Sequence, residues 1–146
     1  MQTLQEFLLE KGYTKIKLHL TKTNHFEIRA QINGVRGVFI LDTGASNSCV
    51  GLDASDTFKL DAEDSDVKAS GAGATDMLTQ IAKTNRLKIG KWKKDEVALI
   101  LFNLTHVNTA LINHKSKPID GIIGADILKK GSAIIDYEKK YLYLKN

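Results

Sequence analysis

The chain has 146 residues, of which 42% are apolar and 26% charged, and its formal net charge is +4. These values are typical of one soluble globular domain and exclude two ordinary domains. Cys49 is the single cysteine, which excludes an internal disulfide, and we expect a small buried residue there. No apolar run reaches the ~18 residues that a membrane helix requires, and the N-terminus lacks a signal-peptide pattern. We therefore expect a cytoplasmic protein with no membrane partner.

The ionisable residues show no grouping that predicts a metal site or a nucleic-acid interface. The four histidines neither pair at helical spacing nor flank a cysteine pair. A basic cluster over residues 88–94 is typical of a solvated turn, and no basic helix with interleaved aromatic residues is present. We therefore expect no metal, no cofactor and no nucleic-acid partner.

Residues 1–24 predict a short helix followed by a strand. Thr3 and Glu6 have the spacing of a capping box at the start of the helix, and Gly12 ends it. Apolar residues then alternate with polar ones over residues 16–20, which is the pattern of a half-buried strand.

The next segment predicts a β-hairpin. Apolar residues alternate over residues 26–32, and Asn33-Gly34 is a strong signal for a tight hairpin turn. The returning strand, residues 35–41, becomes apolar on both faces near its end, which indicates burial on both sides. The hairpin therefore delivers the following residue, Asp42, directly from the core.

The rest of the chain predicts further short strands and short helices. We expect helices at residues 52–60 and 125–130 and an acidic loop at 61–66, while residues 103–118 favour neither state. We expect the lone tryptophan, Trp92, to pack in the core or at a sheet edge. The remaining expected strands are a hairpin over 67–82 with a glycine-rich tip at 70–73, then 87–89, 96–102, 119–123, 133–136 and 141–144.

Asp42-Thr43-Gly44-Ala45 carries the main chemical signal. A buried ionised carboxylate costs several kcal/mol unless it is paired or hydrogen-bonded. Gly44 allows a tight turn, so that its N–H and that of Ala45 could reach the Asp42 carboxylate. The same tripeptide is also compatible with an ordinary turn at a strand end, so the motif alone does not establish catalysis.

Two segments resemble the retropepsin-like aspartic proteases. Residues 32–46 resemble the family's active-site segment, in which a hairpin leads apolar residues into Asp-Thr-Gly-Ala. Residues 119–128, Ile-Asp-Gly-Ile-Ile-Gly-Ala-Asp-Ile-Leu, resemble its later block, in which paired aliphatic residues and a glycine lead into a short helix. The resemblance implies a mostly β fold, a closed retropepsin-like barrel with short helices. It spans one domain, residues 25–146, after an N-terminal extension, residues 1–24.

The resemblance implies an aspartic endopeptidase. In that family two carboxylates share one proton and activate water against a peptide carbonyl. This chain has one Asp-Thr-Gly, and residues 120–122 lack the hydroxyl that a second copy would need. We therefore expect a two-fold homodimer in which Asp42 of each copy faces its mate and Thr43 braces the two loops. Residues 141–144 are a candidate strand for dimerisation.

Other residues have weaker implications. Gly71, Ala72 and Gly73 lie where the family has its flap, which closes over an extended peptide substrate; a plain surface hairpin is the structural alternative. Asp126 is expected to cap its helix or to face solvent. Two other functions compete with the peptidase. One is a non-catalytic dimeric binding or scaffold module with the same fold. The other is a phosphate-binding β-domain, which the absence of a suitably spaced lysine disfavours.

Overall fold

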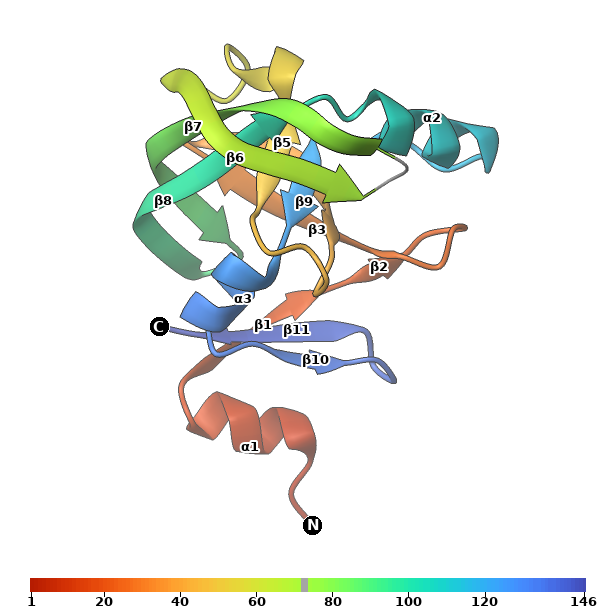
Figure 1. The fold of residues 1–146 in the computed structure, drawn as a ribbon. Coiled ribbons are helices and arrows are strands. Elements are labelled where there is room, and N and C mark those ends of the chain that lie inside the picture. Colours follow the sequence, from red (N-terminus) through yellow and green to blue (C-terminus); the bar gives the residue numbers. More distant parts are fainter. Residues whose placement is uncertain (72–73) are drawn as a thin grey trace.

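The computed structural model describes the backbone of residues 1–71 and 74–146, and the side chains of residues 1–65 and 78–146. Figure 1 shows a β-barrel at the top, a small sheet formed by β1, β11 and β10 beneath it, and α1 on the far side of that sheet. The helix α3 lies between the barrel and the small sheet.

The described part of the chain is mostly β. Its helices are α1 (Leu4–Glu10), α2 (Thr105–Asn113) and α3 (Ala125–Lys130), with one 3-10 turn at Leu52–Ala54. The strands are β1 (Tyr13–Lys17), β2 (His19–Leu20), β3 (Phe26–Ile32), β4 (Val35–Leu41), β5 (Cys49–Gly51), β6 (Ala62–Gly71), β7 (Ala74–Ile89), β8 (Trp92–Phe102), β9 (Gly121–Ile123), β10 (Ile134–Asp136) and β11 (Tyr141–Lys145).

Six strands close into a barrel in the order β3-β4-β9-β5-β8-β7. The ring closes where β3 pairs with β7, with Ile32 opposite Leu87, and β2 and β6 extend it on the outside. Closure gives each of the six ring strands a hydrogen-bonded neighbour on both sides over part of its length. The expected closed barrel with short helices is confirmed.

The strand β9 is inserted between β4 and β5. It runs parallel to β4 and antiparallel to β5, so the segment that connects β4 to β5 must pass over its end. Gly121 permits this insertion, because a Cβ there would lie 2.1 Å from the carbonyl oxygen of Cys49. The two segments singled out in the sequence, 32–46 and 119–128, therefore lie side by side.

The small sheet joins the two ends of the chain. The strand β11 lies in its centre and pairs with β1 on one side and β10 on the other. The prediction that residues 141–144 dimerise is therefore wrong, because both edges of β11 are already paired. Among the described strands, β10 ends this sheet on the side away from β1.

The core fills the barrel and continues toward the small sheet. Its largest fully buried side chains include Trp92, Phe39 and Phe58. Trp92 is 0% exposed, and its indole N–H donates to the carbonyl oxygen of Lys145 at 3.2 Å. Of the two expected positions for Trp92, the core or a sheet edge, the structure shows the core, and its hydrogen bond ties the barrel to β11.

The N-terminal helix and the first hairpin follow the sequence closely. The hydroxyl of Thr3 accepts the Glu6 N–H at 3.1 Å, which confirms the predicted N-cap. Asn33 and Gly34 both adopt positive φ, at 52° and 85°, as a tight hairpin turn requires. The strand expected over residues 16–20 is interrupted at Leu18, whose N–H donates to the carbonyl of Lys140 at 2.9 Å.

Two other expectations are wrong. Residues 52–60 do not form a helix beyond the 3-10 turn at Leu52–Ala54, which has no side-chain cap. The acidic segment 61–66 is not a loop, because β6 begins at Ala62 and pairs with β7. Glu63 and Asp64 have exposed side chains on this outer strand, where Glu63 pairs with Lys83 at 2.7 Å. The undecided stretch 103–118 contains α2.

Candidate active site

Asp42 lies where β4 leaves the core. Its predecessors Ile40 and Leu41 are buried, whereas the Asp42 side chain is exposed in the single chain. The N–H of Gly44 donates to its Oδ1 at 2.9 Å, as expected. The N–H of Ala45 instead donates to the backbone carbonyl of Asp42 at 3.2 Å. The expectation of a buried carboxylate is wrong for one copy, because the chain turns outward at this residue and leaves the acid hydrated.

Segment 123–125 holds the loop that carries Asp42. The N–H of Asp42 donates to the carbonyl of Ile123 at 2.9 Å, and the N–H of Ala125 donates to that of Ala45 at 2.7 Å. Gly124 makes the approach possible, because a Cβ there would lie 2.5 Å from the Ala45 oxygen. The geometry of the loop therefore depends on two segments about eighty residues apart in the sequence.

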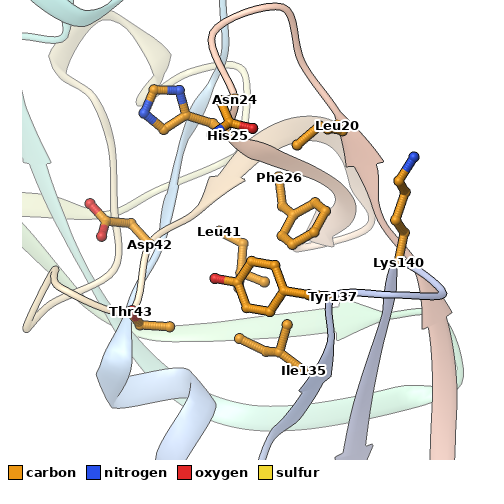
Figure 2. Close-up of a pocket in the computed structure, with 10 residues that line it drawn as sticks. All are labelled: Leu20, Asn24, His25, Phe26, Leu41, Asp42, Thr43, Ile135, Tyr137 and Lys140. Carbon is orange, nitrogen blue, oxygen red and sulfur yellow. The ribbon is translucent and has the colours of Figure 1, made fainter.

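A pocket of about 350 Å³ opens beside Asp42 and Thr43. Figure 2 shows the Asp42 carboxylate and the His25 imidazole on one side of this pocket, with the Tyr137 ring in its middle. Most of its other lining side chains are apolar and come from β2, β3, β4 and β10. The lining residues are Leu20, Asn24, His25, Phe26, Leu41, Asp42, Thr43, Ile135, Tyr137 and Lys140.

The residues predicted for the site are partly brought together. Asp42, Thr43, Gly44 and Ala45 form one loop, and Thr43 is exposed beside the pocket. Gly71 ends β6, while Ala72 and Gly73 lie outside the described residues. The catalytic role of Asp42, the supporting role of its neighbours and the flap stay predictions.

Ser48 and Asp126 were not singled out for the site from the sequence. Asp126 does not simply cap its helix or face solvent. Its carboxylate accepts both the N–H and the hydroxyl of Ser48, at the end of the Asp42 loop. The two residues are 78 positions apart, so no local spacing pattern reveals the contact. The polar Ser48 before an apolar strand and an acid just after Gly124 are the only hints in the sequence.

Cys49 lies behind the same loop and is 4% exposed. Burial raises the pKa of its thiol to about 12, and the negative charges of Asp126 and Asp42 add to this rise. The thiol therefore stays protonated at neutral pH and is a poor nucleophile. The expectation of a small buried residue is confirmed.

Among the described side chains, those of residues 1–65 and 78–146, no group of three or more His, Cys, Asp or Glu residues could hold a metal ion. In the part of the chain whose backbone is described, residues 1–71 and 74–146, none of the helices has the length and apolar character needed to cross a membrane.

Solved structures similar to this chain share its fold. A retropepsin-like aspartic protease from Rickettsia conorii matches with a TM-score of 0.59 at 19% identity, over 91% of this chain and 89% of that one. EIAV protease complexed with the inhibitor HBY-793 matches with a TM-score of 0.57 at 17% identity, over 75% and 90% of the two chains. The retroviral protease-like domain of Ddi1 from Leishmania major matches with a TM-score of 0.54 at 19% identity, over 82% and 87%.

A search of the curated proteins gave no match. The sequence model of the aspartyl protease family matches residues 28–127, which include both β4 with the Asp42 loop and β9 with the start of α3. This match covers more than half of the chain and includes the two segments that build the loop. The chain therefore belongs to the aspartyl protease family.

Proposed function

We propose that this chain is one subunit of a homodimeric aspartic endopeptidase in which Asp42 of each copy forms the catalytic pair. The observation that carries the proposal is the exposed Asp42 carboxylate on an anchored loop, oriented by the Gly44 N–H at 2.9 Å. Among the described side chains, none of the ion pairs includes Asp42. Its carboxylate is therefore available to a second carboxylate and to water.

The chemistry follows from placing two such carboxylates side by side. Two close negative charges repel, so the pair retains one proton. The ionised member takes a proton from the attacking water, and the protonated member donates to the peptide carbonyl oxygen. Water adds to the carbonyl carbon, and the peptide C–N bond then breaks as the leaving nitrogen is protonated. The substrate we propose is an extended peptide, whose backbone can hydrogen-bond to strands and loops beside Asp42.

Three features support a second copy as the missing half. The chain carries one Asp-Thr-Gly. Among the described strands, β10 is the edge of its sheet, and an edge strand can pair with its copy across a two-fold axis. The pocket beside Asp42 includes Ile135 of β10, and the adjacent Tyr137 is 71% exposed. Pairing through β10 would cover this apolar surface and bring the two Asp42 loops together.

Substitution of Asp42 by Asn tests the proposal. The change keeps the size of the side chain but removes its ability to take a proton, so peptide cleavage should fall by roughly 10²–10⁴-fold or more. Cleavage of a peptide library from pH 4 to 7 measures this loss, and size-exclusion chromatography checks that the variant still associates. The matched control is Asp61→Asn, at another exposed acid, which should cleave like the unmodified chain. Unchanged turnover by Asp42→Asn would reject Asp42 as the catalytic acid, whereas an unmodified chain that cleaves no peptide would favour the non-catalytic binding module.

A further inference from the structure

Asp126 uses its carboxylate to hold the end of the Asp42 loop. Both carboxylate oxygens accept the N–H of Ser48, each at 3.0 Å, and Oδ1 also accepts the Ser48 hydroxyl at 2.7 Å. Oδ1 further accepts the N–H of Ile127 at 2.8 Å. An acid that only capped its helix would need only the last of these contacts, so three of the four hydrogen bonds serve the loop.

Ser48 closes the network. It is 0% exposed. Its hydroxyl oxygen accepts the N–H of Gly124 at 2.8 Å, and the same hydroxyl donates a hydrogen bond to Asp126. The hydroxyl is thus used both as donor and as acceptor, which a buried polar group requires. The two ends of the Ser48 link, Gly124 and Asp126, flank Ala125, whose N–H binds the carbonyl of Ala45.

The loop is therefore held at its beginning, middle and end by one short segment. Ile123 binds the N–H of Asp42, Ala125 binds Ala45, and Asp126 binds Ser48. We propose that Asp126 is a positioning residue that fixes the catalytic loop in the geometry in which Asp42 can act, an inference that rests on the proposed function. Ser48 is the residue through which it acts.

The charge of Asp126 is part of this role. The residue is half-buried, and none of the ion pairs between described side chains includes it. Hydrogen bonds to an ionised acceptor are stronger and more directional than neutral ones. A neutral acceptor of the same shape should hold the loop less tightly, and a side chain without an acceptor should release it.

Three variants of the full chain test the proposal: Asp126→Ala, Asp126→Asn and Ser48→Ala. Asp126→Ala should lower kcat by about tenfold or more and change KM by less than about threefold, because misplacement of Asp42 impairs the chemical step more than peptide binding. Asp126→Asn keeps an oxygen acceptor for Ser48 and should recover part of kcat. The kcat of Ser48→Ala should fall about as far as that of Asp126→Ala.

A general loss of stability has to be separated from a loss of position. Leu8→Ala is the matched control, because Leu8 is buried in α1 on the far side of the small sheet. All variants are assayed at a temperature at which circular dichroism shows them folded. The proposal predicts that Leu8→Ala keeps kcat within about twofold of the unmodified chain. Equal losses of kcat in Leu8→Ala and Asp126→Ala, or no recovery in Asp126→Asn, would overturn it.

Amide hydrogen exchange at Gly44 tests the same proposal without any activity. The Gly44 N–H donates to Asp42. It should exchange about tenfold faster or more in Asp126→Ala than in the unmodified chain, and its rate in Asp126→Asn should lie between these two. Unchanged exchange in Asp126→Ala would refute the positioning role even in an active enzyme. Conversely, faster exchange in Asp126→Ala, together with an unmodified chain that cleaves no peptide, would support the positioning role and reject the peptidase.

Discussion

At the scale of single residues, the exposure of Asp42 decides whether the free-energy cost of a carboxylate pair opposes folding of the subunit or association of two subunits. In one copy the acid is hydrated and held by the Gly44 N–H, so folding of the subunit does not have to bury a charge. In the proposed dimer, desolvation and repulsion between two acids act on association instead. The hydrogen bonds of the loop to Ile123, Ala125 and Asp126 already fix its geometry within one subunit, before association.

Cys49 gives a pH prediction at this scale. Its thiol has a pKa raised by burial to about 12 in the folded chain, whereas an unfolded cysteine ionises near pH 8.5. Above that lower value the unfolded chain loses a proton that the folded chain keeps, so stability should fall between about pH 8.5 and 12. The loss approaches about 1.4 kcal/mol per pH unit for this one group.

Chemical denaturation from pH 7 to 10 measures this dependence, with Cys49→Ala as the comparison. The difference in unfolding free energy between the two chains should shrink as pH rises, because only the unmodified chain carries the thiol. Parallel curves for the two chains would show that Cys49 is not held protonated by the fold.

At the scale of elements, contacts within a few residues could be predicted and contacts between distant strands could not. The β3–β4 hairpin follows from local alternation and Asn33-Gly34, and the Asp42–Gly44 hydrogen bond spans two positions. The insertion of β9, the β3–β7 closure and the Ser48–Asp126 link join residues far apart in the sequence. The acidic composition of residues 61–66 led us to predict a loop where β6 begins, because an outer strand can keep charged side chains hydrated.

The free edge of β10 carries the prediction for association. Tyr137 follows this strand, is exposed, and packs against Phe26 with 5.0 Å between ring centroids. Tyr137→Lys should place two like charges near the proposed two-fold axis and weaken the dimer by about tenfold or more. Analytical ultracentrifugation measures the dissociation constant of the dimer. The control Ile112→Lys changes an exposed apolar residue of α2 and should leave association unaltered; an equal effect of both would argue against β10 as the interface.

At the scale of the whole molecule, the first and last segments of the chain form one layer. The strand β1 pairs with β11 along five residues, from Tyr13 opposite Lys145 to Lys17 opposite Tyr141. The family match begins at residue 28, so the division into an extension, 1–24, and a protease domain, 25–146, stays a prediction. The pairing indicates that the extension supports the sheet from which β10 emerges.

Deletion of residues 1–24 tests this support. The deletion removes the buried side chains Leu8, Ile16 and Leu18, each of which contributes about 1.5–3 kcal/mol, and it exposes an edge of β11. The melting temperature should fall by roughly 10 °C or more, as followed by circular dichroism. Deletion of residues 1–2 alone, which are exposed, should change little. Equal melting temperatures for the shortened and intact chains would show that the extension does not stabilise the domain.

Subunit mixing tests most directly whether two Asp42 side chains build one site. Unmodified chain and Asp42→Asn are combined in equal amounts at fixed total concentration, and native mass spectrometry confirms that subunits have exchanged. Random pairing leaves about one quarter of the dimers with two Asp42 residues, so peptide cleavage should fall to about one quarter of that of the unmodified chain. Cleavage at about one half would mean that each Asp42 works without a mate, which would contradict the proposed dimeric site.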